Sequence, residues 1–291
     1  MAPAIRWLSR RGLKGAGDAE ANREYAIGLA RAFGGAIIFG YPLMMTMEMW
    51  WLGFHMDRAR LLLFLAITLA MLCGLSFFAG FQQASSAKAV ALDALSAFGV
   101  AVIASALALM CFGILTAEMS LDELAGKLAI QAIPASFGAS LARKQLGSKE
   151  EEAQEEQREA RAGYKAQLFL MTAGALYMAF SVAPTEEMLL IAYKMTPWHG
   201  LALAFASIAL LHAFVYAVGF GGQESVPEGA PRWTAFANYT LAGYGIAIVV
   251  SLYVLFTFGR TDDVALPAIT MMTVVLAFPS ALGAAIARLV V

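Results

Sequence analysis

The chain of 291 residues is 60 % apolar and only 14 % charged, and its net charge is −1. Ordinary soluble domains carry roughly a quarter charged residues, so this composition excludes a typical soluble protein. No basic patch is interleaved with aromatic residues, which excludes a nucleic-acid-binding protein. We therefore expect a membrane protein whose surroundings are a lipid bilayer.

Residues 1–31 come first and are too polar for a secretory signal, which needs an uninterrupted apolar core. We expect an uncleaved cytoplasmic N-terminal segment.

Eight apolar runs follow this segment. Two of them, 61–81 and 233–259, contain no charge and exceed the ~20 residues that a helix needs to cross a bilayer. The fourth run has the lowest hydropathy because it contains Lys127 and Gln131. The expected spans are 32–54, 60–81, 90–116, 124–142, 166–193, 200–220, 233–259 and 265–287.

The second half of the sequence repeats the first. A shift of 139 positions aligns residues 35–81 with 174–220, with 11 identities in 47 positions. A shift of 145 aligns PASFGASLAR with PSALGAAIAR, which begin at Pro134 and Pro279. Because the last run is strongly apolar, its weaker partner at 124–142 is also expected to span the membrane. The matched pairs include Thr46/Thr185, Glu48/Glu187 and Met49/Met188.

The expected fold class is all-α, a polytopic membrane protein with eight transmembrane helices in two parallel four-helix repeats, 32–145 and 166–291. An even number of crossings in each repeat makes both repeats enter from the same side. The repeats should therefore be related by a pseudo-two-fold axis along the membrane normal. Residues 146–165 are expected to form a charged, cytoplasmic linker.

The Lys and Arg residues predict the orientation. With the N-terminus inside, fifteen of the twenty lie on the inner side and five on the outer side, as the positive-inside rule requires. We expect a location in the cell inner (plasma) membrane with both termini in the cytoplasm. The sequence leaves the oligomeric state open, and a homo-oligomer is among the alternatives.

The duplicated Thr-x-Glu and Pro-x3-Gly-Ala-x2-Ala-Arg motifs resemble an uncharacterised family of bacterial integral membrane proteins with a domain of unknown function. The resemblance covers residues 25–291. It implies a membrane protein and supplies no activity, ligand or catalytic residue.

Glu48 and Glu187 are the main candidates for function, because an ionisable residue inside a span is costly unless it is paired or hydrated. Apolar sequence flanks both residues. We expect them to form a pair in an outer vestibule near the repeat axis, beside Thr46 and Thr185. A plainer alternative is that 166–185 spans alone and that Glu187 is an outer-loop residue.

A basic residue follows each glutamate by seven positions, His55 after Glu48 and Lys194 after Glu187. Residues seven apart share a helix face, so this spacing is compatible with a path for cations or protons. The alternative is that His55 and Lys194 are ordinary interfacial residues.

Small residues in the fourth and eighth runs predict close helix packing. Gly138 and Ala142 form this face in the fourth run, and Gly283 and Ala287 form it in the eighth. We expect these two helices to pack tightly. Packing of the two against each other is one arrangement that would use both faces.

Other chemistry is poorly supported. The methionines around His55 are better explained by apolar packing than by Cu(I) binding, and His212 is either a proton relay or a packing residue. The enzyme motifs of hydrolases, phosphate binders and metalloproteases are missing. We expect no enzyme activity, no metal site and no cofactor.

These features favour a transporter or channel for a small cation or protons. The alternative is a non-transporting scaffold or sensor that contacts partners through its cytoplasmic segments.

Overall fold

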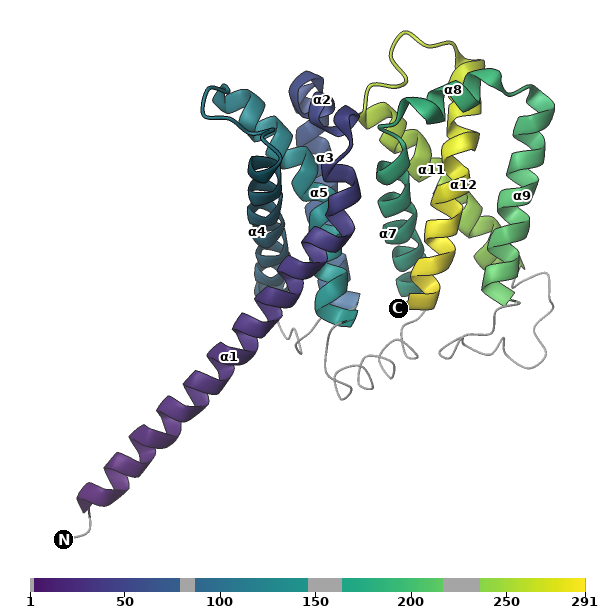
Figure 1. Ribbon diagram of the computed structural model, residues 1–291. Helices are drawn as coiled ribbons and strands as arrows, with labels where there is room; N and C mark the ends of the chain where they lie inside the picture. The colour runs from purple at the N-terminus through teal and green to yellow at the C-terminus, as the bar shows by residue number, and fades with distance from the viewer. Residues whose placement is uncertain (1–2, 79–86, 146–163, 217–235, 291) are drawn as a thin grey trace, which may run out of the picture.

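The computed structural model describes residues 3–78, 87–145, 164–216 and 236–290 (Figure 1). These residues form ten α-helices and one short π-helix, and the same ranges contain no strand. The expected all-α class is confirmed. The predicted linker lies outside the described residues except for Tyr164 and Lys165.

The helices follow one another in two sets, which we call the first half (residues 3–145) and the second half (residues 164–290). The first half contains α1 (Pro3–Met44), α2 (Met47–His55), α3 (Arg58–Phe78), α4 (Ala87–Cys111) and α5 (Leu121–Gln145). The second half contains α7 (Tyr164–Val182), α8 (Glu186–Lys194), α9 (Pro197–Tyr216), the π-helix η1 (Phe236–Leu241), α11 (Ala242–Thr257) and α12 (Leu266–Val290).

Seven segments of the described chain are long and apolar enough to cross a membrane. They lie in α1, α3, α4, α7, α9, η1 with α11, and α12. The helix α5 is not among them, because its first half contains Asp122, Glu123, Lys127 and Gln131. Several membrane-spanning helices are therefore present, one fewer by this criterion than the eight that the sequence predicts.

The expected runs 32–54 and 166–193 are not continuous helices. The first breaks between α1 and α2, where Thr46 is extended with φ −88° and ψ 116°. The second breaks between α7 and α8, where Thr185 has φ −68° and ψ 142°. The Pro184 ring explains the second break, because proline has no N–H to donate and disfavours helical geometry in the residue before it.

Each threonine hydroxyl donates to a carbonyl in the last turn of the preceding helix, where carbonyls lose their partners in the helix. The Thr46 hydroxyl donates to the Pro42 carbonyl at 2.9 Å, and the Thr185 hydroxyl donates to the Val182 carbonyl at 2.9 Å. A further donor, the Trp50 indole N–H, reaches the Met44 carbonyl at 2.6 Å. These bonds offset the loss of helical hydrogen bonds at the breaks.

Glycines hold the main helix pair of each half together. In the first half α1 packs along α5, and a Cβ added to Gly35 would overlap the Gly138 carbonyl and the Ala142 Cβ. In the second half α7 packs along α12, and a Cβ added to Gly174 would overlap the Gly283 carbonyl and the Ala287 Cβ. Close backbone approach of this kind is typical of membrane helix pairs.

The predicted small-residue faces are thus used, but not between the fourth and eighth runs. The partners of α5 and α12 are α1 and α7, because Gly35 and Gly174 let those backbones come closest. Gly35 and Gly174 are themselves a matched pair in the repeat alignment, which is the signal that points to these partners.

The two halves meet through aromatic residues. Phe64 of α3 lies edge-on to Phe180 of α7 and to Phe258 after α11, with ring centroids 6.0 and 5.6 Å apart. Phe137 of α5 also meets Phe180, at 5.4 Å. All four rings are buried. This interface therefore consists largely of apolar side chains rather than of close backbone contacts.

Candidate functional site

Glu48 and Glu187 lie in the first turns of the short helices α2 and α8. Both helices are at the end of the bundle opposite the C-terminus (Figure 1). The apolar sequence that flanks each glutamate therefore belongs to two helices separated by a break. Both carboxylates lie beyond the ends of the spans in α1 and α7.

The structure does not bring the two glutamates together. The main contacts of α2 are with α5, and those of α8 are with α12. Glu48 is half-buried, whereas Glu187 is exposed. Within the described ranges, neither carboxylate forms an ion pair and no hydrogen bond joins them.

His55 and Lys194 are in the last turns of the same two helices. The His55 ring stacks on Trp51 with centroids 5.1 Å apart, and its Nδ1 lies 3.2 Å from the Trp51 carbonyl. Lys194 is exposed. An acid in the first turn and a base in the last turn both complement the helix dipole, so this arrangement stabilises each short helix locally.

An ion pair joins the two halves, and no sequence pattern predicts it. The Arg60 guanidinium in α3 donates to both carboxylate oxygens of Asp262, at 2.7 and 2.8 Å. Asp262 lies in the turn between α11 and α12, and the Arg60 guanidinium also lies 4.6 Å above the Phe256 ring. A planar guanidinium suits both contacts, which lysine would not reproduce.

This contact also changes the acidity of Asp262. The hydrogen bond from Arg60, aided by its positive charge, lowers the pKa of the Asp262 carboxyl below its ordinary value of 3.8. Asp262 is therefore charged at neutral pH. The partners are 202 positions apart in the sequence, which explains why no local pattern predicts their contact.

A second arginine, Arg58, joins three elements of the first half. Its guanidinium donates to the Gly53 carbonyl of α2 at 3.2 Å and to the Asp122 carboxylate of α5 at 2.5 Å. In the same region, Lys127 pairs with Glu123 at 2.6 Å within α5. Asp122, Glu123 and Lys127, the charged residues in the first half of α5, are thus all paired.

Three further polar side chains, Gln131, Asp93 and His212, contact neighbouring helices. Gln131 of α5 is fully buried, its Nε2 lies 3.4 Å from the Leu43 carbonyl, and its Oε1 has no partner among the described residues. In α4, Asp93 accepts a hydrogen bond from the Ser76 hydroxyl of α3 at 2.8 Å. His212 of α9 lies 3.0 Å from the Thr240 hydroxyl of η1, a contact that links two helices.

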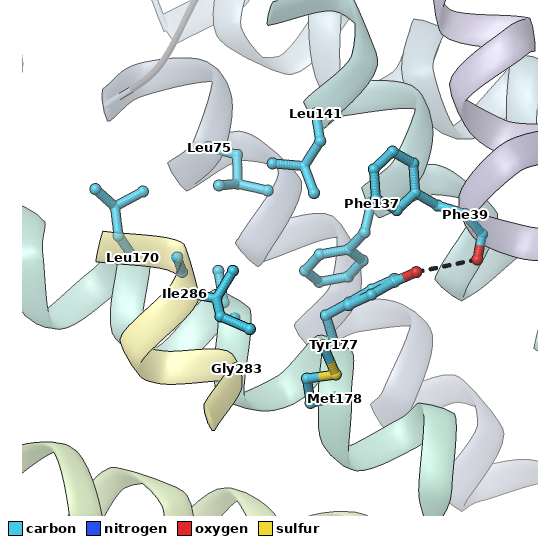
Figure 2. A pocket seen from close by; sticks show the side chains of 12 residues that line it. Phe39, Leu75, Phe137, Leu141, Leu170, Tyr177, Met178, Gly283 and Ile286 are labelled. Carbon is cyan, nitrogen blue, oxygen red and sulfur yellow. Dashed lines mark hydrogen bonds between the residues drawn. The ribbon is translucent and has the colours of Figure 1, made fainter. Parts of the chain in front are cut away.

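A cavity of about 160 Å³ lies between the two halves (Figure 2). Residues of α1, α3 and α5 line it from the first half, and residues of α7 and α12 from the second. The Tyr177 hydroxyl points away from the cavity and donates to the Phe39 carbonyl at 3.0 Å. This hydrogen bond is a second polar link between the halves, in addition to the Arg60–Asp262 ion pair.

One protein-family model covers nearly all of the chain. Residues 28–291 match the family described as "Putative integral membrane protein (DUF2391)". The chain belongs to this family. Membership confirms the resemblance inferred from the duplicated motifs, and the protein is an integral membrane protein in contact with the lipid bilayer. No curated protein and no solved structure matches the chain.

The DUF2391 match covers nearly all of the described helices, from within α1 to the end of α12. Its description assigns no reaction or ligand. Among the described residues of this DUF2391 chain, no three His, Cys, Asp or Glu side chains gather closely enough to hold a metal ion. The candidate regions are therefore the charged end with α2 and α8 and the interface between the halves.

Proposed function

We propose that this protein is an inner-membrane transporter for a small cation or protons, built from two parallel four-helix repeats that move relative to each other. The observation that carries the proposal is the contrast in packing. Each half is held by a glycine contact between backbones, whereas the halves meet through side chains around a cavity. In transporters built from repeats, one repeat rocks against the other around a site at their interface.

The helix boundaries support the repeat. Shifting α2 by 139 positions gives the bounds of α8, Glu186–Lys194, and shifting α5 by 145 gives the bounds of α12, Leu266–Val290. Gly113 and Gly259, 146 positions apart, both have φ +70°. Recurrence of this left-handed conformation favours a duplicated unit, since few residues other than glycine adopt it.

Eight crossings follow if α5 also spans the membrane. Its 25 residues correspond to about 37 Å of helix, which exceeds a hydrocarbon core of ~30 Å. Residues 130–139 are all buried, so the middle of α5 is shielded from lipid by other helices. Pairing of its charged residues at one end lowers the cost of crossing.

In this proposal Glu48 and Glu187 attract the cation at the outer end. Carboxylates at the mouth of a low-dielectric passage raise the local concentration of cations. Thr46 and Thr185 donate to carbonyls at the ends of α1 and α7, directly before each short helix, and His55 and Lys194 set the charge at its other end. The protein acts without a cofactor and without enzyme activity.

The deciding experiment is ion flux with the purified protein in liposomes. H⁺, Na⁺, K⁺, Ca²⁺ and Mg²⁺ gradients are applied in turn, and protein-free liposomes provide the baseline. We expect protein-dependent flux for at least one ion. Baseline flux for all five would reject the proposal.

The second candidate is a non-transporting scaffold or sensor. The apolar lining of the cavity favours it, since an ion would find no polar group there. The N-terminal part of α1 also projects away from the bundle, where it is available as a contact arm (Figure 1). Baseline flux, together with a bound partner that is lost when residues 3–21 are deleted, would support this function.

A further inference from the structure

The cavity between the halves has the properties of a binding site for an apolar molecule. All twelve lining residues are apolar except Tyr177. The Tyr177 hydroxyl is occupied by the Phe39 carbonyl and points away from the space (Figure 2). The lining therefore offers no free side-chain hydrogen-bonding group to a bound water, ion or polar solute.

The glycine contact between α7 and α12 forms part of the cavity wall. Gly174 and Gly283 both line the cavity, and their backbones touch each other. Any side chain at either position would overlap the carbonyl oxygen of the other glycine. The contact that holds α7 to α12 thus borders the cavity, and neither of these two positions places a side chain in it.

The volume is large enough for a ligand. An apolar cavity of about 150 Å³ in another protein stays free of water and binds benzene or xenon. The cavity here has about 160 Å³. A space of this size accommodates several carbons of a chain, and it is too small for a complete lipid.

The cavity is shared by equivalent positions of the two halves. Phe39 and Met178 both line it and are 139 positions apart, and Leu141 and Ile286 both line it and are 145 apart. The same two shifts align the halves in sequence. The cavity therefore lies where the two halves face each other.

The position in the membrane identifies the class of occupant. Phe39, Leu75 and Leu170 belong to helix segments that can span a bilayer. The cavity is partly open. Ile286, one of the lining residues, has 38 % of its surface exposed. The apolar molecules that surround spanning helices are lipid acyl chains.

We propose that this cavity binds the end of a lipid acyl chain, which lies between the two halves. The site requires only that the lining helices span the bilayer, so it does not rest on transport. A chain held there fills the interface and changes how closely the halves approach each other.

The test is photolabelling of the full-length protein in liposomes. The probe is a phosphatidylcholine with a diazirine near the end of one acyl chain, and labelled residues are identified by peptide mass spectrometry. We expect labelling to concentrate on cavity residues such as Leu170, Tyr177 and Met178. Labelling there should saturate as the probe fraction rises, as at a defined site.

Two matched variants in α3 provide the control. Leu75→Phe adds bulk inside the cavity, and Leu62→Phe adds the same bulk at a residue that is 66 % exposed. We expect Leu75→Phe to reduce cavity labelling severalfold, because the larger side chain takes up space that the acyl chain would fill. Leu62→Phe should leave it unchanged. If Leu75→Phe unfolds the protein, Ala173→Val adds bulk to the same cavity from α7 instead.

Labelling that is spread evenly over the exposed faces of the helices would overturn the proposal. So would saturable cavity labelling that neither cavity-filling variant reduces. Flux measured on the same preparations separates the two ideas: cavity labelling without flux supports the lipid site alone, and flux without cavity labelling supports transport alone.

Discussion

At the scale of single residues, the effect of a charge depends on where its partner lies. Glu48 and Glu187 begin short helices, and each is followed by a base in the last turn of the same helix. The helix dipole accounts for this placement without any ligand. Asp262 differs, because its partner Arg60 belongs to the other half of the molecule. If Glu48 and Glu187 only stabilise their own helices, removal of their charge should leave transport unchanged. If they act in transport, removal of their charge should lower the flux.

The first prediction concerns Glu48→Gln and Glu187→Gln. If the carboxylates attract the cation, each replacement should lower flux about tenfold, the lower end of what a focusing charge contributes. Glu186→Gln is the matched control, because Glu186 is also in the first turn of α8 but has no acidic counterpart in α2. Flux is measured in liposomes and thermal unfolding in detergent. Unchanged flux in both variants would leave the glutamates with only a role in helix stability.

The second prediction concerns the ion pair between the halves. Arg60→Asp places two carboxylates together and should lower the unfolding temperature, whereas the exchanged pair Arg60→Asp with Asp262→Arg should recover part of the loss. The measurement is thermal unfolding at pH 7 in low salt, because salt screens exposed charges. No recovery in the exchanged pair would show that the two side chains do not interact.

The pH dependence of this ion pair has a defined direction. The pKa of Asp262 is lower in the folded protein than its ordinary value of 3.8, so the ion pair contributes its full stability above that value. The contribution is lost as the pH falls through the lower, folded-state pKa. Between pH 7 and pH 3, Asp262→Asn should therefore lose less stability than the unmodified protein. An equal loss in both proteins would contradict this assignment.

At the scale of elements, the fold depends on how closely pairs of helices approach. The contacts of α1 with α5 and of α7 with α12 both depend on glycine backbones. The short helices α2 and α8 begin instead after breaks, where threonine hydroxyls donate to carbonyls of the preceding helix. Backbone contacts have little tolerance for added atoms, because nothing at the contact can rotate away.

The third prediction compares two adjacent glycines of α1. A Cβ at Gly35 would overlap α5, whereas a Cβ at Gly34 would meet nothing within 4 Å. Gly35→Ala should therefore cost about 1–3 kcal/mol of unfolding free energy through overpacking. Gly34→Ala should add about 0.5–1 kcal/mol by restricting the unfolded chain. Denaturant unfolding in mixed micelles measures both, and equal effects would show that α1 does not approach α5 at Gly35.

At the scale of the whole molecule, orientation and the number of crossings depend on α5. Seven segments have the hydropathy of membrane spans, and α5 lacks it because of its charged first half. If α5 crosses, both halves begin on the same side of the membrane. If it does not, the second half is inverted with respect to the first.

The fourth prediction tests α5 directly by cysteine labelling in intact cells, after replacement of Cys73 and Cys111. Ala117→Cys precedes α5 and Lys165→Cys follows it, and both positions are exposed. An impermeant reagent applied from outside should label position 117 and not position 165. Labelling of both positions would show that α5 does not cross, and the proposed parallel repeats would then be wrong.

Much of the local structure is predictable from the sequence. The apolar runs locate the spans, because apolar composition over about twenty residues is what a bilayer selects. The repeat alignment pairs Gly35 with Gly174 and Thr46 with Thr185, the residues that form the helix contacts and breaks of each half. The breaks between helices are less predictable, because residues 42–54 stay mostly apolar on both sides of the point where α1 ends.

The sequence by itself determined the all-α class, the membrane location, most spanning segments and the family, because these follow from composition and from neighbours a few residues apart. Only the tertiary structure decided that α5 packs on α1 and that α12 packs on α7. It also decided that Arg60 meets Asp262, 202 positions away in the sequence, and that a cavity lies between the halves. Each apolar helix has several faces of similar hydrophobicity that could contact another helix. The surrounding lipid does not favour burial of one of these faces over another. Which faces meet depends on how closely two backbones can approach, and that distance is a property of the assembled pair.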